Sequence, residues 1–465
     1  MNYSGHPDDR PRQPEAENSR GHKLRRLMTY AGYGLGGAVL AGAALLLIFN
    51  GALLNGYGKR KLEHNYAATH PGSTLRIGKL YYVVGPNRLV ARSVTLSTAN
   101  STYKAGRISL TGVRWSQFLL GKSALVDAMA NAGLDASKLD MEFLRSRYGI
   151  RCKRLQAMAP NSELTAEGIE LSPLAGDEEI CAANPFRTTR YTVTVPECRI
   201  SGLDVGEILQ GKSYRARSVI FIRPAFDAFA YHEKPSGPFV KSPLMVNQAL
   251  AAIRLPVRVD SLSITGGWVA YRDRVASGAA PGVLTFTEVD LNAEGITNRG
   301  QADDSIVLRA QGKMMDAGLL KMTLAIPAAS TDLSFKCSGS LGAMDLTRLG
   351  PFLSIVEHYD ISSGRVERAE FEIDVASGRA RGRVRANFSD LTIAVLDKTT
   401  GSQKGLGNRI ASFLANQFKI RGTNSPEQSA PMKVGRVSYR RKPGDTFLQV
   451  VWYALKSGVL DVIHQ

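Results

Sequence analysis

The sequence predicts a mainly β protein with few short α-helices, preceded by one membrane-spanning helix. Three observations predict this class: a long uncharged apolar segment near the start, alternation of apolar and polar residues through most of the remainder, and clusters of Gly, Pro, Asn and Asp between the alternating segments. The chain has 465 residues, of which 44% are hydrophobic and 22% are charged. These values exclude a disordered, a collagenous or a disulfide-dense protein.

The first 58 residues divide into a polar tail and an apolar segment. Residues 1–26 are rich in Arg, Asp, Glu and Pro and are expected to form a disordered cytoplasmic tail. Residues 27–58 contain no charged side chain. Because roughly 20 apolar residues suffice to cross a bilayer, this segment predicts a transmembrane helix. A cleaved signal peptide fits less well, since its polar lead is usually shorter and no A-x-A site follows.

The charges that flank the apolar segment predict its orientation. Residues 12–26 contain five Lys and Arg, and residues 59–61 contain three. The larger number before the segment favours an N-terminus in the cytoplasm. No later segment is apolar enough for a second span, so we expect a single-pass protein with its bulk beyond the membrane.

Strand-like alternation dominates the rest of the chain. Each alternating segment places apolar side chains on one face of a strand and polar side chains on the other. Clear examples are residues 75–80, 257–264 (with one slip at Ser261), 334–338 and 379–386.

Helical spacing is rare by comparison. Ser242 and Pro243 form an N-terminal helix signal, because Ser is a good N-cap and Pro is tolerated in the first turn. The expected helices are residues 244–253, 124–132, 406–418 and 450–464.

Two pairs of segments form a faint internal repeat. Residues 107–122 are echoed by residues 199–212, and both read as a strand followed by an aliphatic turn and Gly-Lys. Residues 89–96 and 214–221 share an Ala-Arg-Ser-Val core. The repeat indicates one β-rich architecture made of similar strand–turn units.

Three stretches of the chain carry motifs that resemble those of one known protein family. Residues 75–121 contain LVARSVTLS and end in WSQFLLGK, and are similar to the amino-terminal module of that family. Residues 257–298 begin VRVDSLSITGGWVAYRDR. Residues 339–458 contain GAMDLTRLGPFL, ISSGRVERAEFEI, GRVRANFSDLTIAVLD and VGRVSYRRKPGDTFLQVVWYALKSG. The family is the AsmA-like envelope proteins, and the order of these motifs is similar to the carboxy-terminal part of an AsmA-related group.

The resemblance implies an anchor in the bacterial inner membrane and a periplasmic body. It implies a long, curved, mostly antiparallel β-sheet with a hydrophobic groove, here of about 25 strands spaced by about 4.8 Å. The expected regions are the tail 1–26, the transmembrane helix 27–58, an N-terminal AsmA-like region 59–240 and a C-terminal one 241–465. The alternation itself fits an open groove and a closed sandwich equally well.

One segment matches a nucleotide-binding motif. Gly206, Gly211, Lys212 and Ser213 fit the P-loop spacing GxxxxGK[ST]. In a true P-loop a helix begins at the Ser, whereas residues 214–221 alternate as a strand. We interpret the match as coincidental and expect no cofactor.

The four cysteines and the histidines are the next candidate site residues. One disulfide is expected among Cys152, Cys181 and Cys198, with its pairing open, and Cys337 is expected to be a buried free thiol. No histidine pair has metal-ligand spacing, so no metal site is expected.

The net charge of +18 is concentrated late in the chain. Residues 379–465 contain 15 Lys and Arg against 5 Asp and Glu. Alternating arginines would form a basic strip on one sheet face: Arg379, Arg381, Arg383 and Arg385. A solvated face is one interpretation, and contact with anionic lipid headgroups is the other. Nucleic acid is not expected, because few aromatic residues interleave with the arginines.

These observations together predict a non-enzymatic membrane protein. With the family resemblance they predict lipid handling or transport, or a role in outer-membrane and envelope biogenesis, with phospholipid or another anionic envelope lipid as partner. The alternative is a scaffold for envelope assembly that binds no lipid. No catalytic motif favours an enzyme.

Overall fold

The computed structural model describes residues 54–83, 85–114, 125–235, 246–276, 278–301, 304–328, 332–396, 421–427 and 431–464. The predicted tail 1–26 lies outside the described residues, as do most of the predicted transmembrane helix 27–58 and the predicted helix 406–418. The last five residues of the apolar segment form a π-helical turn, η1 (Leu54–Gly58), which leads into α2 (Lys59–Thr69). No helix within the described ranges is long and apolar enough to cross a membrane.

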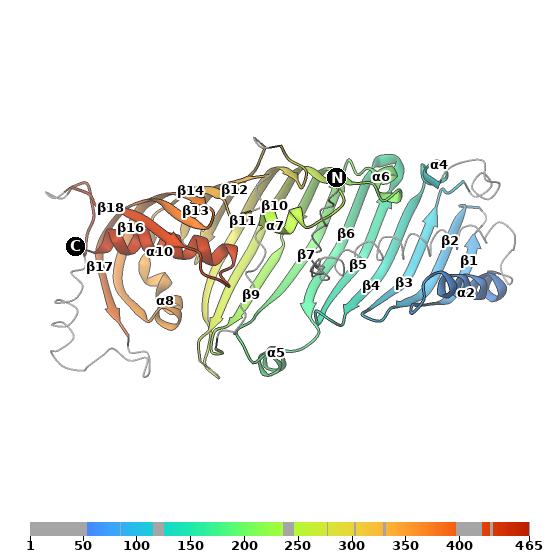
Figure 1. The fold of residues 1–465 in the computed structure, drawn as a ribbon, viewed down its shortest axis with the longest axis horizontal. Helices are drawn as coiled ribbons and strands as arrows, with labels where there is room; N and C mark the ends of the chain where they lie inside the picture. The colour runs from blue at the N-terminus through green and yellow to red at the C-terminus, as the bar shows by residue number, and fades with distance from the viewer. Residues whose placement is uncertain are drawn as a thin grey trace, which may run out of the picture.

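One sheet of 18 strands forms the body of the protein (Figure 1). Its first nine strands are β1 (Thr74–Val83), β2 (Arg88–Ser97), β3 (Ser101–Thr111), β4 (Gly133–Phe143), β5 (Tyr148–Met158), β6 (Glu163–Pro173), β7 (Thr189–Ser201), β8 (Tyr214–Ile222) and β9 (Ala225–Tyr231). The other nine are β10 (Val257–Arg274), β11 (Gly282–Thr297), β12 (Ser305–Met314), β13 (Gly318–Pro327), β14 (Phe335–Leu341), β15 (Met344–Asp345), β16 (Tyr359–Ala376), β17 (Arg379–Val395) and β18 (Val434–Arg440).

Strands that follow one another in the chain pair antiparallel almost throughout, with a single parallel junction. β7 pairs with both β8 and β9, which follow each other along one line of the sheet. β10 then pairs parallel with β8 and β9. The predicted boundary at residue 240 falls in the connection between β9 and β10, outside the described residues, and the sheet is continuous across this junction.

The prediction of a mainly β, mostly antiparallel fold is confirmed. The expected number of strands, about 25, is too high for the described residues, because the strands are longer than the usual five or six residues. β10 and β16, for example, contain 18 residues each. At about 4.8 Å between neighbouring strands, the sheet spans about 70 Å.

The helices are short and lie at the ends and edges of the sheet. Three of the four expected helices lie in described residues and are present as α4 (Leu125–Met129), α7 (Val246–Ala251) and α10 (Phe447–Ile463). The sequence did not indicate α2, α5 (Asp177–Ala183), α6 (Val205–Leu209) or α8 (Gly350–Val356).

A row of unpaired residues crosses the first seven strands, and we call it the kink row. In each of these strands one residue has no partner in the register, although the residues before and after it are paired. The unpaired residues of neighbouring strands lie opposite each other. The row consists of Gly78, Ser93, Gly106, Lys138, Lys153, Gly168 and Pro196. The backbones of Ser93, Lys138 and Gly168 are left-handed, with φ of 52°, 54° and 60°.

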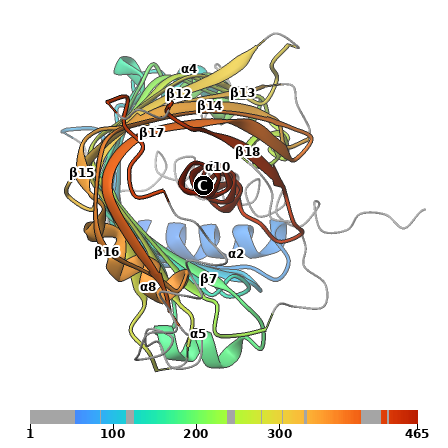
Figure 2. The same cartoon turned by 90° about the vertical axis from the view of Figure 1, so that its left-hand side faces the viewer.

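The kink row shifts the side-chain alternation by one residue in each strand. On β2, Leu89 and Ala91 before the row and Val94 and Leu96 after it all contribute to one apolar cluster. Strict period-two alternation would place the second pair on the opposite face. An unpaired residue also bends its strand, and Figure 2 shows the sheet curved around a concave face.

Glycines in the kink row make room for their neighbours. A Cβ on Gly78 would lie 2.9 Å from Cβ of Ser93, and one on Gly106 would lie 3.0 Å from Cβ of Lys138. Gly168 has the same constraint, with 3.0 Å to Cβ of Lys153, and adds a positive φ.

The two free edges of the described sheet are β1 and β18. Side chains of the helical segments beside them accept hydrogen bonds from backbone amides of both edge strands. On β1, the carboxylate of Glu63 accepts a hydrogen bond from the Ile77 amide at 2.7 Å, and Asn55 accepts one from the Leu80 amide at 3.1 Å. On β18, Asp461 of α10 accepts from the Arg436 amide at 2.7 Å. Ser457 likewise accepts from the Ser438 amide at 3.1 Å. Both edges are thereby protected from pairing with another strand.

We expect Gly168→Ala to destabilise the fold by about 1–2 kcal/mol, because an L side chain is strained at positive φ. The matched control is Gly85→Ala, since a Cβ there has nothing within 4 Å. Urea unfolding followed by circular dichroism measures both. Equal midpoints for the two variants would contradict the role given to the kink row.

Candidate functional site

The concave face of the sheet is apolar along its length. Tracing the register from strand to strand assigns to it the apolar residues on both sides of the kink row. In the middle of the sheet its fully buried members are small: Cys152, Ala166, Val195 and Cys198. The larger aliphatic side chains there are only half-buried, and include Leu139, Leu155, Leu164, Ile169, Val193 and Ile200.

Among the residues that the structure describes, helices cover the two ends of this face and leave its middle uncovered. At one end Leu54, Leu62 and Tyr66 of η1 and α2 pack against β1 to β3. At the other end α10 lies inside the curve of the sheet, against β16 to β18 (Figure 2). The apolar cluster between them, among the described residues, contains side chains of strands and of Leu203 only. The half-buried aliphatic residues of β4 to β7 therefore form an apolar strip of the concave face that no described helix covers.

The helix α10 is mostly apolar, and only part of it contacts the sheet. Val450, Ala454, Gly458 and Val462 are buried. Close contact is achieved through Gly458, since a Cβ there would lie 2.6 Å from Val384 and 2.8 Å from Val437.

Two apolar side chains of α10 remain exposed. Leu448 is 59% exposed and Val459 is 44% exposed. Their separation of 11 residues places them on one side of the helix, since three turns occupy about 11 residues. This side of α10 therefore leaves apolar surface uncovered by the described residues. The sequence of residues 450–464 alone did not show which side of the helix would be exposed.

Polar contacts fix the position of α10. Thr446 and Gln449 form a capping box at its start. Glu357, which follows α8, accepts a hydrogen bond from Trp452 Nε1 at 3.2 Å and forms an ion pair with Lys456. The helix is consequently joined to α8 as well as to the sheet.

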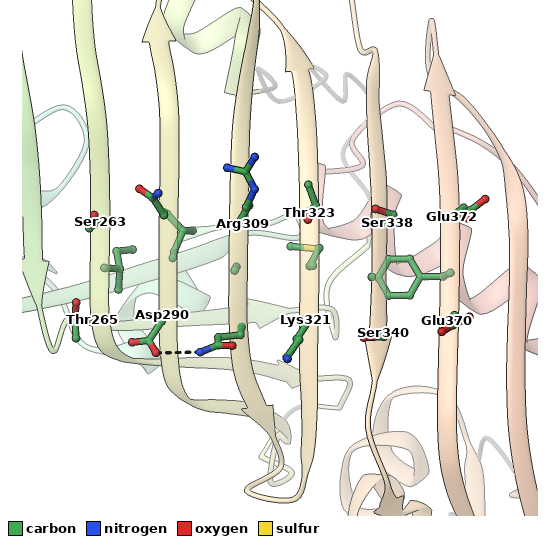
Figure 3. A pocket seen from close by; sticks show the side chains of 18 of the residues that line it. Ser263, Thr265, Asp290, Arg309, Lys321, Thr323, Ser338, Ser340, Glu370 and Glu372 are labelled. Atoms are coloured by element: carbon green, nitrogen blue, oxygen red, sulfur yellow. Dashed lines mark hydrogen bonds between the residues drawn. The ribbon is translucent and has the colours of Figure 1, made fainter.

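The convex face is polar by contrast. A pocket of about 890 Å³ lies on strands β10 to β16. Gln311 donates a hydrogen bond to Asp290 there at 3.4 Å, and Figure 3 shows the side chains that line the pocket. Positive, negative and hydroxyl side chains line it together: Ser263, Thr265, Arg309, Lys321, Thr323, Ser338, Ser340, Glu370 and Glu372. Their mixed charge does not define one ligand class.

The P-loop match does not have P-loop geometry. Gly206 lies inside α6, and Gly211, Lys212 and Ser213 form the turn between α6 and β8. The helix thus precedes the Gly-Lys-Ser and a strand follows it, the reverse of the P-loop order. The Ser213 hydroxyl donates a hydrogen bond to Glu207 instead of facing a ligand.

The four predicted arginines lie on β17 and are all exposed on the convex face: Arg379, Arg381, Arg383 and Arg385. Arg383 forms an ion pair with Glu372 of β16 at 2.7 Å. The sequence predicted this strip of β17. It did not predict the arginines of β18 beside the strip, because β18 comes from a separate part of the chain.

All four cysteines are free and buried, so the expected bridge among Cys152, Cys181 and Cys198 is not formed. Cys152 on β5 and Cys198 on β7 are separated by β6, which implies a Cα distance of about 10 Å, too long for a disulfide. Cys181 lies in α5 and donates a hydrogen bond to Glu233 at 2.7 Å. Cys337 is buried, as predicted.

We expect four thiols per chain when the protein is denatured without reductant and titrated with a disulfide reagent. In the folded protein the reaction at pH 8 should be slow, because burial raises the pKa of Cys198 to about 11 and that of Cys337 to about 12. A count of two thiols in the denatured protein would contradict the free state.

An ionic cluster lies beneath α5. Arg190 of β7 forms ion pairs with Asp177 at 2.6 Å and Asp227 at 2.7 Å. Arg274 of β10 pairs with Glu233 at 2.8 Å, and the two side chains are 7% and 5% exposed. The cluster joins α5 to the strands of the parallel junction.

This cluster makes stability depend on pH. Burial alone would raise the pKa of Glu233, but hydrogen bonds from Cys181 and Arg274 outweigh it and hold the pKa below its usual value. A carboxylate with a lowered pKa stabilises the fold above the pKa of the unfolded chain, about 4.3, and this contribution is lost as the pH falls through the folded-state pKa.

We expect Glu233→Gln to lower stability at pH 7 and to flatten the loss of stability below about pH 4. Unfolding midpoints measured from pH 7 to pH 3 test this. Glu294→Gln is the control, because that carboxylate is exposed on the convex face. Parallel pH profiles for wild type and Glu233→Gln would contradict the assignment.

No metal-ligand cluster is present in the part of the chain that the structure describes. Comparison with known proteins adds no assignment: no family model matches the chain, and no curated protein matches it. The AsmA-like resemblance therefore stays a prediction based on the motifs themselves.

Proposed function

We propose that this protein is an AsmA-like, single-pass protein of the bacterial inner membrane whose periplasmic body handles or transports lipid in support of envelope biogenesis. The observation that carries the proposal is the apolar strip on the concave face, formed by half-buried aliphatic side chains of β4 to β7 that no described helix covers. We infer that this strip lines an open groove. The anchor is the uncharged segment at residues 27–58.

The physical argument concerns exposed apolar surface. Apolar area in contact with water costs about 25 cal/mol per Å², and contiguous exposed patches of more than a few hundred Å² mark binding sites. An acyl chain gains about 0.8 kcal/mol for each CH₂ group that it buries. A linear, apolar ligand matches a groove that crosses successive strands, and the ligand's polar group can remain in water.

The α10 helix supports the same conclusion from one end of the groove. The exposed Leu448 and Val459 extend the apolar surface beyond the strands. No charged ligand or reacting group is required by this surface, so the proposal includes no cofactor and no catalytic step.

We expect native mass spectrometry of the full-length protein, released from detergent, to show bound phospholipid. Leu164→Asp should remove most of the bound lipid, because it places a charge among the apolar side chains of the groove. The control is Thr165→Asp, the next residue on β6, whose side chain points to the convex face by alternation.

A second variant separates loss of binding from loss of folding. Leu164→Trp keeps the groove apolar but fills space, and should also reduce the bound lipid while the unfolding midpoint stays near that of wild type. Repeated absence of lipid from the wild-type protein would contradict the proposal and would favour the alternative function, a scaffold for envelope assembly.

A further inference from the structure

We propose that the convex face of β17 and β18 is a docking surface for an anionic membrane, separate from the groove. Six arginines of this face are exposed, and we call them the arginine surface: Arg379, Arg381, Arg383, Arg385, Arg436 and Arg440. They come from two strands that are separated in the sequence and adjacent in the sheet.

The register places like charges directly opposite each other. Arg379 of β17 lies opposite Arg440 of β18, and Arg383 lies opposite Arg436. Like charges in this arrangement destabilise a sheet. A face that served only for solubility would gain from acidic residues on β18, as β16 provides on the other side of β17. An external anion that binds these arginine pairs would remove the repulsion between them.

Acidic neighbours compensate only part of this charge. The residues of β16 opposite the strip are Glu370, Glu372 and Asp374. Among the ion pairs of described residues, however, the only arginine of this surface that participates is Arg383, through Glu372 at 2.7 Å. The β18 side of the arginine surface therefore keeps an excess of positive charge.

The shape and composition of this face favour a bilayer. Guanidinium groups bind phosphate through paired hydrogen bonds, and several of them on an extended strand pair suit a surface of many phosphates. Val434 lies on the same face, opposite Arg385, and is 44% exposed, which provides an apolar contact next to the charges. Nucleic acid is less well matched, because no aromatic side chain among the described residues of this face is available for base stacking.

The arginine surface and the first described residues lie at opposite ends of the sheet. Leu54, in the last part of the apolar segment 27–58, packs beside β1, whereas β17 and β18 form the other end (Figure 1). The arginine surface is consequently about 70 Å of sheet away from Leu54. This separation allows it to contact a membrane surface other than the one at the anchor.

The test uses the full chain reconstituted in phosphatidylcholine nanodiscs, with added fluorescent vesicles. We expect capture of vesicles that contain phosphatidylglycerol, little capture of pure phosphatidylcholine vesicles, and loss of capture at high salt. The variant R379Q/R381Q/R436Q/R440Q should weaken capture at least about tenfold, since each basic residue near an anionic surface contributes measurably.

A charge-matched control separates this surface from general charge. R151Q/R199Q/R258Q/R309Q removes the same number of positive charges from exposed arginines that form ion pairs elsewhere. It should capture vesicles normally. Equal losses in both variants, or equal capture of neutral vesicles, would overturn the proposal.

Two further outcomes keep the proposals distinct. Leu164→Asp should capture vesicles like wild type while losing its bound lipid, so the groove and the arginine surface can fail independently. Binding of double-stranded DNA with the same dependence on the four arginines, and without vesicle capture, would replace the membrane with nucleic acid as partner.

Discussion

The kink row is the constraint on which the concave architecture depends. Seven neighbouring strands each carry one unpaired residue at the same level, so the strands bend together. The unpaired residue also shifts which side chains point to the concave face. The spacing of apolar residues in the sequence changes at the same position, as Leu89, Ala91, Val94 and Leu96 show. Without that match, half of each strand would place its aliphatic residues on the convex face. The groove therefore follows from a backbone irregularity.

The second constraint is that a long open sheet must end without inviting further pairing. Helices at both ends solve this in the same way, since α10 and the η1–α2 segment contact the concave face and also place side-chain oxygens against free edge amides. The two ends are thereby closed to strand addition, while no described helix covers the middle of the concave face. Edge protection and groove boundaries are provided by the same elements.

The junction between β9 and β10 has a different character. Parallel pairing interrupts an otherwise antiparallel order, and buried ion pairs on the convex side join it to α5. Buried ion pairs contribute little net stability, because desolvation offsets their attraction, but removing one partner is costly. The cluster thus fixes one arrangement of β7, β9, β10 and α5. Charge serves a structural purpose there, whereas on β17 and β18 it faces outward.

The sequence by itself determined the class of fold, because alternation and turn residues are local signals, and it also indicated α4, α7, α10 and the arginine strip of β17. It missed α5 and the ionic cluster, since Asp177 and Arg190 meet only through tertiary packing. It suggested a disulfide because three cysteines are close in sequence, whereas the structure separates them by a strand and by opposite faces of the sheet. Only the tertiary structure decided which apolar residues the described helices leave uncovered and that Arg436 and Arg440 join the strip, because both depend on which distant segments become neighbours.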